Sequence, residues 1–155
     1  MIFLDSSDVH EIIDWKNAGV IRGVTTNPTI LKKDGVSKKD IKSTMLEICK
    51  VVFPYPVSIE ITTQGFYASM LVEAKETFAW APNVVIKVPI HGPDGETNLP
   101  LINELSNARV RVNVTACMNA QQLFLANQAG AAYVSLFGGR VADMGHDVES
   151  EIKKY

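Results

Sequence analysis

The chain has 155 residues, of which 46% are hydrophobic, and its formal charge is −2 at pH 7. This length and apolar content suffice for one sizeable core, so we expect a single domain over residues 1–155. The near-neutral charge, with basic residues only in small pairs, argues against nucleic acid as a partner and against a membrane surface. No apolar run approaches the length of a membrane span.

The use of cysteine and histidine predicts neither a disulfide nor a metal site. Cys49 and Cys117 lie far apart and match no metal or redox spacing, and the three histidines are scattered without ligand spacing. Reduced thiols are typical of a cytoplasmic protein. The first five residues lack a basic segment and predict a strand rather than a signal peptide.

Short apolar runs alternate with amphipathic segments along the first half of the chain. A strand over residues 2–5 is followed by a helix from Asp8, which offers a cap, to about Asn17. Gly19 ends this helix and a second strand covers residues 20–25. A lysine-rich loop then leads to a helix over about 37–50, in which the apolar residues gather on one side.

The second half repeats the alternation. The predicted elements are a strand over 57–61, a helix over about 64–79, a strand over 84–89, a helix over about 98–107, a strand over 110–114, a helix over 119–129, a strand over 131–136, a glycine-punctuated loop, and a helix from Asp147 onward. Short connections between alternating strands and helices predict a parallel sheet with right-handed crossovers.

Two α/β architectures satisfy this pattern. A doubly wound open sheet of six strands suits the length, whereas a (β/α)8 barrel needs two more strands and about 200 residues as a minimum. Periodicity alone therefore favours the open sheet.

Lys87 interrupts the apolar run Val84–Pro89. A buried ammonium is costly unless it is paired or has lost its proton. One interpretation is a strand-end lysine whose stem snorkels to water. The other is a desolvated amine at the carboxyl end of a strand, able to attack a carbonyl and form a Schiff base.

The other strand ends favour the second interpretation. The strands end in polar groups, and the carboxyl ends of parallel strands share one rim. These strand-end residues are Asp5, Thr25-Thr26-Asn27, Glu60, Lys87, Asn113 with Thr115, and Ser135. Asp5, Glu60 and Lys87 stand against apolar neighbours, and two carboxylates beside an amine resemble an acid/base site around a nucleophilic lysine.

At these strand ends the chain resembles the transaldolase family, whose small members include the fructose-6-phosphate aldolases. The matching motifs occur in the family's order and cover nearly the whole chain: Leu4-Asp5-Ser6-Ser7, Gly23-Val24-Thr25-Thr26-Asn27-Pro28, Ile86-Lys87-Val88-Pro89, Val112-Asn113-Val114-Thr115 and Ser135-Leu136-Phe137-Gly138-Gly139-Arg140. The resemblance implies the TIM (β/α)8-barrel fold, with about six βα units in this chain, in place of the open sheet.

The resemblance also implies catalytic roles. Lys87 would be the Schiff-base lysine and Asp5 the general acid/base at carbon–carbon cleavage. Glu60 and Thr115 would hold the water that carries protons between Asp5 and the imine.

Further strand-end residues would contact the substrate. By resemblance, Asn27 and Asn113 hydrogen-bond its hydroxyls, Thr26 lines the same rim, Ser135 contacts the substrate and Arg140 faces its phosphate.

The identities of Glu60 and Phe137 separate two activities within the family. Aldolase members have Gln and typically Tyr at these positions, and the resemblance therefore favours transaldolase. Proton chemistry supports the same choice. A carboxylate that orients the water favours keeping the three-carbon unit bound to the lysine, whereas a tyrosine hydroxyl could protonate that unit and help release it as free dihydroxyacetone.

The implied reaction moves a dihydroxyacetone unit between sugar phosphates of the pentose phosphate pathway, with no cofactor or metal. The implied substrates are fructose 6-phosphate, sedoheptulose 7-phosphate, erythrose 4-phosphate and glyceraldehyde 3-phosphate, and we expect a homo-oligomer. One alternative is an aldolase that releases free dihydroxyacetone, and another is a non-catalytic family fragment.

The chain stops after the sixth predicted strand, whereas the family continues through two more. Barrel phosphate sites usually involve the loops after strands seven and eight, so Arg140 lacks its expected companions. We therefore expect the 155-residue chain to bind sugar phosphates weakly, to turn over little, and to self-associate through its unpaired strand edges.

Overall fold

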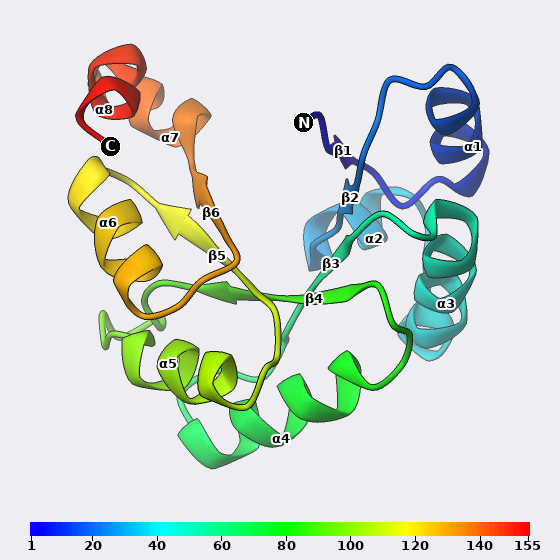
Figure 1. Cartoon of the computed structure of the whole chain (residues 1–155), viewed down its shortest axis with the longest axis horizontal. Helices are drawn as coiled ribbons and strands as arrows, with labels where there is room; N and C mark the ends of the chain where they lie inside the picture. The colour runs from blue at the N-terminus through cyan, green and yellow to red at the C-terminus, as the bar shows by residue number, and fades with distance from the viewer.

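The computed structural model describes residues 1–155, in which six parallel strands form one curled sheet with the order β1-β2-β3-β4-β5-β6. Each strand therefore pairs only with its neighbours in sequence (Figure 1). The strands are β1 (Leu4–Asp5), β2 (Val24–Thr25), β3 (Val57–Glu60), β4 (Val84–Pro89), β5 (Val112–Cys117) and β6 (Tyr133–Leu136).

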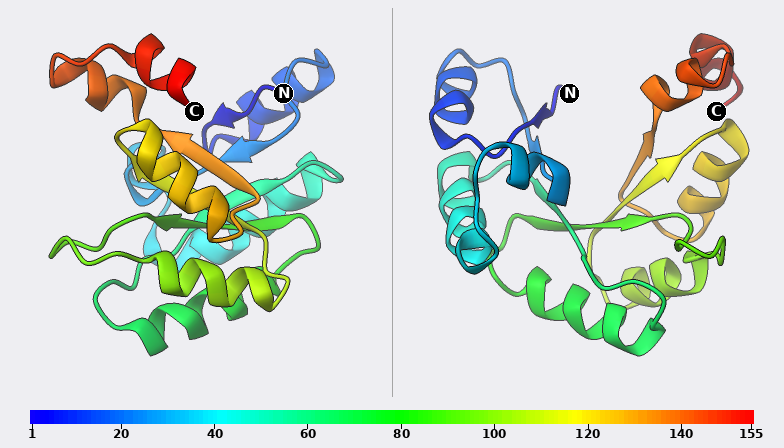
Figure 2. Two further views of the ribbon diagram at one scale, coloured as in Figure 1. Left: turned by 60° about the vertical axis from the view of Figure 1, so that its left-hand side comes forward. Right: turned by 180° about the vertical axis from the view of Figure 1, so that it is seen from behind.

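The helices lie outside the curl of the sheet (Figure 2). They are α1 (Val9–Asn17), α2 (Pro28–Lys33), α3 (Ile41–Val52), α4 (Tyr67–Phe78), α5 (Leu99–Asn107), α6 (Ala120–Gln128), α7 (Gly138–Asp143) and α8 (Val148–Lys154), with a 3₁₀ turn, η1 (Lys38–Asp40). None is long and apolar enough to span a membrane.

The strand order decides between the two predicted architectures. A doubly wound sheet reverses its strand order at a switch point and carries helices on both faces. This sheet does neither, because its strands follow chain order and its helices lie on one side. The fold is therefore a partial (β/α) barrel of the TIM type, and the open-sheet preference from periodicity was wrong.

Two helices occupy segments that the sequence predicted as loops. At the start of α2 the Asn27 side chain accepts a hydrogen bond from the amide of Ile30, and Pro28 holds the first helical position. An amide cap followed by proline is a strong helix start, and the lysine-rich composition obscured it. The other unpredicted helix is α7, which begins at the glycine pair.

Alternation along the strands separates a helix-facing core from an inner face. In β4, Val84, Ile86 and Val88 belong to the core of 26 buried residues packed against the helices. Successive side chains of a strand point to opposite faces, so Val85 and Lys87 lie on the concave inner face. Both are buried, as are Asn113 and Thr115 on the same face, whereas Glu60 is partly buried and Asp5 is exposed.

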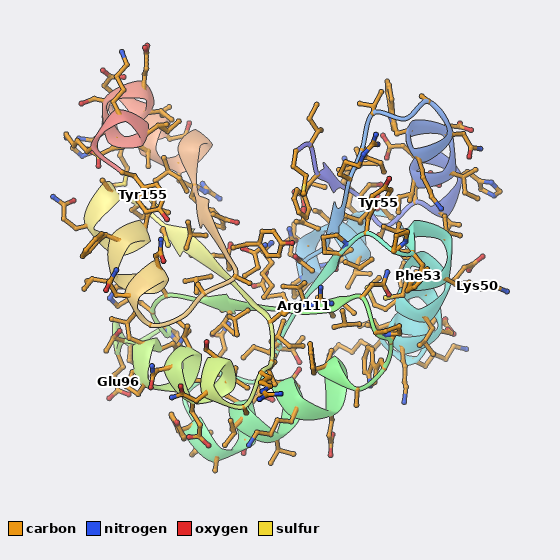
Figure 3. The ribbon with its side chains drawn as sticks, in the orientation of Figure 1. Lys50, Phe53, Tyr55, Glu96, Arg111 and Tyr155 are labelled. Atoms are coloured by element: carbon orange, nitrogen blue, oxygen red, sulfur yellow. The ribbon has the colours of Figure 1, made fainter.

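The last helix is tied to α6 by polar contacts. The Glu151 carboxylate accepts a hydrogen bond from the amide of Ala120, the first residue of α6, at 2.9 Å. The Tyr155 hydroxyl accepts one from the Asn127 side-chain amide at 2.9 Å. Figure 3 labels Tyr155 at the end of the chain. These contacts hold the C-terminal end of the chain against α6.

An aromatic pair joins the two edges of the sheet, next to β1 and in β6. The rings of Phe3 and Tyr133 meet edge to face with their centroids 5.5 Å apart. Gly23 makes room for this arrangement, because a Cβ atom there would lie 2.3 Å from the Phe3 ring. The glycine is therefore required by close approach, not by its backbone angle.

We expect Gly23→Ala to lower the free energy of unfolding by about 1–3 kcal/mol, since the new methyl group must displace the Phe3 ring. Denaturant titration would measure the loss. Gly139→Ala is the matched control, because a methyl group there would have no neighbouring atom within 4 Å. Equal stability of the two variants would contradict the steric role of Gly23.

Candidate active site

Lys87 lies near the middle of the inner face with 6% of its surface exposed. Its Nζ lies 3.5 Å from Oε2 of Glu60 and donates a hydrogen bond to the Thr26 carbonyl oxygen at 3.4 Å. The register explains the pairing, because Glu60 is aligned with Lys87 across β3 and β4. The lysine therefore does not snorkel to water. Its amine is held beside a carboxylate in a largely dry site.

Burial raises the pKa of the Glu60 carboxyl above its ordinary value. The Lys87 ammonium opposes this shift, and the charge of Asp5 adds to it, which places Asp5 within electrostatic reach of the pair. A carboxyl with a raised pKa exchanges its proton closer to neutral pH. Glu60 is therefore suited to take a proton from the neighbouring amine and to return it.

Asp5 is oriented by Thr25, which the sequence placed among the strand-end residues without giving it a role. The Thr25 hydroxyl donates a hydrogen bond to Oδ1 of Asp5 at 2.7 Å, and the two residues are aligned across β1 and β2. Strand alternation could have identified Thr25, because it shares the inner face with Asp5. The neighbouring Thr26 points the other way, so its hydroxyl donates to the Ser58 carbonyl and lies 3.6 Å from the sulfur of Met45.

Asn27 stands at the rim between β2 and α2. Its side-chain oxygen is committed to the Ile30 amide at 3.0 Å, which leaves its NH2 group free to donate.

A polar relay connects β3, β5 and β6 on the inner face. The Ser135 hydroxyl donates to Oδ1 of Asn113 at 2.9 Å, and Nδ2 of Asn113 donates to Oγ of Ser58 at 3.2 Å. Asn113 is aligned with Lys87 across β4 and β5. The relay therefore fixes the orientation of the Asn113 amide directly beside the lysine strand. Ser58 was not among the predicted strand-end residues.

Thr115 brings an unsatisfied hydroxyl to the end of β5. Its Oγ1 is buried and has no protein hydrogen-bond partner. The next residue, Ala116, has φ 59°, in the left-handed region that costs a residue other than glycine some strain, and the pairing of β5 with β6 shifts register there. Buried hydroxyls normally find a partner, so Oγ1 is suited to bind a water or a substrate atom.

Phe137 and Arg140 lie just after the last strand, β6, in the segment that leads into α7 and in α7 itself. Phe137 precedes α7 and is 38% exposed. The Arg140 side chain is 75% exposed, and its guanidinium lies 4.0 Å from the Asp143 carboxylate on the same helix. The structure therefore does not bring Arg140 into contact with the Lys87 cluster.

Glu73 fixes the loop that follows Glu60. Its carboxylate accepts hydrogen bonds from the amides of Thr62 and Thr63 at 2.8 Å each and from the Thr62 hydroxyl at 2.9 Å. Burial alone would raise the pKa of Glu73, but these hydrogen bonds outweigh it and hold the pKa below its ordinary value. The ionised carboxylate therefore stabilises the folded loop.

We expect Glu73→Gln to lower the free energy of unfolding by about 1–3 kcal/mol at pH 7. In the unfolded chain Glu73 titrates near its ordinary pKa of 4.5, so its stabilisation is fully present above that pH. It is lost as the pH falls through the lower folded pKa. Denaturation at pH 7 and at pH 3 measures the difference, which should shrink in acid.

The matched control is Glu76→Gln, one turn along the same helix, at an exposed carboxylate without a hydrogen-bond partner. If the difference in the free energy of unfolding between wild type and Glu73→Gln stays constant with pH, the charge of Glu73 is not the cause of the lost stability.

The inner face therefore gathers one amine, two carboxylates, an oriented amide and an unsatisfied hydroxyl. An amine that can be relieved of its proton beside a carboxylate can attack a carbonyl, and the further acid groups can move protons to and from the bound carbon chain. No three or more His, Cys, Asp or Glu side chains lie close enough to hold a metal ion together.

Comparison with known proteins relates this geometry to a family. The family model described as Transaldolase/Fructose-6-phosphate aldolase matches residues 2–155. A probable transaldolase of Dehalococcoides mccartyi is 44% identical over 146 residues, which is 94% of this chain and 64% of that protein. A probable transaldolase of Streptococcus agalactiae is 40% identical over 152 residues, covering 97% and 66% of the two chains.

A probable transaldolase of Methanococcus maripaludis is 39% identical over 145 residues, or 94% of this chain and 63% of the relative. The chain thus spans just under two thirds of the length of these relatives. The match over residues 2–155 and the barrel-type sheet agree, and the chain belongs to the transaldolase/fructose-6-phosphate aldolase family.

Proposed function

We propose that the chain carries the Schiff-base machinery of a transaldolase, which moves a dihydroxyacetone unit from a ketose phosphate to an aldose phosphate. The observation that carries the proposal is the buried Lys87 amine, 3.5 Å from the Glu60 carboxylate on the inner face of the sheet. The donors would be fructose 6-phosphate and sedoheptulose 7-phosphate. The acceptors would be erythrose 4-phosphate and glyceraldehyde 3-phosphate, in the cytoplasm, where the two free cysteines stay reduced.

The first step of the proposed reaction is imine formation. Glu60 takes the proton from the Lys87 ammonium, and the free amine attacks the ketose carbonyl at C2. Loss of water, with protons supplied by Glu60 and by a water on Thr115, gives the iminium ion. Burial of the pair favours this exchange, because it raises the pKa of the Glu60 carboxyl.

The second step is carbon–carbon cleavage. Asp5 takes the proton of the C4 hydroxyl, the C3–C4 bond breaks, and its electron pair forms an enamine conjugated to the lysine nitrogen. The aldose phosphate leaves, and the enamine attacks the acceptor aldehyde, whose oxygen receives the proton from Asp5. Hydrolysis of the new iminium ion releases the product and restores Lys87.

Reduction with borohydride in the presence of fructose 6-phosphate tests the proposal. We expect the peptide that contains Lys87 to gain the mass of a reduced sugar-derived adduct. Borohydride without the sugar is the blank. An adduct on any other lysine, or none at a sugar concentration that saturates binding, would overturn the assignment, and the chain would then be a non-catalytic member of its family.

We expect the double change Glu60→Gln, Phe137→Tyr to raise the release of free dihydroxyacetone relative to its transfer. A glutamine cannot exchange the proton that Glu60 carries, and Phe137 is exposed enough to accommodate a hydroxyl that protonates the enamine. Product analysis with and without an acceptor aldose gives the ratio. The two single variants are the controls, and an unchanged ratio in the double variant would place the discrimination elsewhere.

A further inference from the structure

A side-chain contact reaches directly from the β1 edge of the sheet to the β6 edge. The rings of Phe3 and Tyr133 meet edge to face with their centroids 5.5 Å apart. Phe3 stands two residues before Asp5, and Tyr133 two residues before Ser135, so both rings share the inner face with those residues. Figure 1 shows β1 and β6 at opposite edges of the curled sheet. The contact, which we call the aromatic brace, therefore crosses the inner face.

Tyr133 is tied to the lysine strand by the register of the sheet. It is aligned with Asn113 across β5 and β6, and Asn113 is aligned with Lys87 across β4 and β5. On the same face of β6, the Ser135 hydroxyl donates to Oδ1 of Asn113 at 2.9 Å. Tyr133 therefore belongs to the half of the inner face that holds the amine.

Phe3 belongs to the half that holds the acid/base residue. Asp5 lies on β1, and the way from β1 to the lysine strand passes through the two shortest strand pairings. The pairing of β1 with β2 and that of β2 with β3 align two residues each, whereas β3 with β4 and β4 with β5 align four each. Short pairings stabilise a strand weakly. The sheet by itself therefore holds Asp5 less firmly than it holds Glu60 or Asn113 beside Lys87.

The aromatic brace supplies a second connection between these two halves. Edge-to-face geometry is a favoured arrangement of aromatic rings, and both rings are partly buried. Gly23 admits the Phe3 ring to this position, because a Cβ atom there would lie 2.3 Å from the ring. The brace thus joins β1 to β6 at the same height of the inner face, two residues below Asp5 and Ser135.

We propose that Phe3 and Tyr133 are positioning residues, which hold Asp5 at the distance from Lys87 that carbon–carbon cleavage requires. This inference rests on the proposed function. In cleavage, Asp5 takes the proton of the C4 hydroxyl while the C3–C4 electron pair moves into the enamine on Lys87, so both residues must reach one substrate. Imine formation uses Lys87 with Glu60 and Thr115, which lie on the firmly paired strands β3 to β5. Loss of the brace should therefore slow cleavage and spare the imine.

Removing either ring separates the two steps. We expect Tyr133→Leu and Phe3→Leu each to slow the single-turnover release of glyceraldehyde 3-phosphate from fructose 6-phosphate by about tenfold to 10²-fold, the effect of a misplacement of about 1 Å. Borohydride trapping of dihydroxyacetone on Lys87 should stay at the wild-type level. Tyr133→Phe keeps the ring and should restore wild-type cleavage.

Phe78→Leu is the matched control, because it removes a partly buried ring that packs against the helix-facing core. It should lower the thermal stability without slowing cleavage by the trapped protein. Equal slowing in Phe78→Leu and Tyr133→Leu would assign the aromatic brace a purely structural role and overturn the proposal, as would trapping that falls in parallel with cleavage in the brace variants.

Two combinations show through which residue the brace acts. The double variant Phe3→Leu, Tyr133→Leu should cleave no more slowly than the slower single variant, since both changes remove the same contact. In the background of Asp5→Asn, Tyr133→Leu should slow cleavage no further, because the residue that it positions is already gone. Losses that multiply in either combination would contradict this assignment.

A distance measurement tests the brace without catalysis. Spin labels on His10→Cys and Gln121→Cys report the separation of α1, which follows β1, from α6, which precedes β6; both positions are exposed, whereas the native cysteines are buried. We expect a narrow distribution of distances in the otherwise unchanged chain and in Phe78→Leu. Tyr133→Leu should broaden it and shift it to longer distances. An unchanged distribution in Tyr133→Leu would overturn the brace, whatever the activity.

The proposed function and this inference fail in different ways. A wild-type chain that forms no adduct on Lys87 rejects Schiff-base chemistry, and the spin-label distances then decide on the brace alone. An adduct together with unchanged cleavage and unchanged distances in Tyr133→Leu upholds the chemistry and rejects the brace. An adduct without any cleavage in the wild type would overturn the link between the brace and Asp5.

Discussion

Replacing Lys87 by methionine is expected to abolish borohydride trapping of fructose 6-phosphate. Lys87 supplies the buried amine of the inner face, and methionine roughly conserves the volume of its stem. Intact-mass measurement of the reduced protein gives the result directly. Because the pKa of Glu60 is already raised by burial, a neutral Glu60 can remain beside methionine without an unpaired charge, and the fold should persist.

The control for this experiment is Lys33→Met, which changes an exposed lysine on α2. We expect full trapping in that variant. Circular dichroism and thermal melting verify that Lys87→Met is folded. An adduct that persists in folded Lys87→Met would exclude the proposed nucleophile.

Replacing Asp5 by asparagine is expected to lower the rate of carbon–carbon cleavage by about 10²–10⁴-fold, the usual contribution of a positioned acid or base. Asparagine can still accept the hydrogen bond of Thr25 but cannot take the proton of the C4 hydroxyl. Imine formation precedes cleavage in the proposed sequence, so trapping with dihydroxyacetone should survive. Quantifying released aldose phosphate in a single turnover, beside the trapped adduct, separates the two steps.

Thr25→Val provides the comparison for Asp5. It removes the hydroxyl that orients the carboxylate while leaving the carboxylate itself, so we expect a smaller loss of cleavage than in Asp5→Asn. Loss of trapping and cleavage to the same extent in Asp5→Asn would place Asp5 in imine formation instead. Unchanged cleavage would remove it from the mechanism.

The strand ends were the most informative part of the sequence. Polar groups embedded in apolar runs are costly to bury, so the sequence around Glu60 and Lys87 already indicated that the two residues share a site. The parallel register places them opposite one another, as common carboxyl ends require. The positions that depend on strand register were therefore accessible from the sequence.

The choice of side chain within a strand end was harder to predict. Thr25 and Thr26 are adjacent and chemically identical, and the predicted strand over 20–25 gave no reason to prefer either. The two threonines differ only in the face of the sheet to which they point. That face follows from the register that aligns Thr25 with Asp5 and Ser58, and β2 has only two paired residues from which to predict this register. The hydroxyl that contacts Asp5 belongs to Thr25, and Thr26 contributes its carbonyl oxygen to Lys87.

Strand order was beyond the reach of periodicity. Every βα unit looks alike in hydrophobic pattern whether the next strand joins on the same side or crosses to the other edge. Helix α2 shows a different limit, because its start carried the Asn27-Pro28 signal but its lysines hid the apolar stripe. The Arg140–Asp143 pair depends on a helix, α7, that the glycine pair obscured.

The pairing of strands with sequence neighbours alone has a consequence for how the molecule is built during synthesis. Each new strand that leaves the ribosome finds the edge it must join already in place, and no earlier hydrogen bond has to break. Glu60, Lys87 and Asn113 stand on the consecutive strands β3, β4 and β5. The amine and its nearest partners are therefore assembled within 54 residues of chain, from Glu60 to Asn113. The aromatic contact between Phe3 and Tyr133 forms only after β6 has been added.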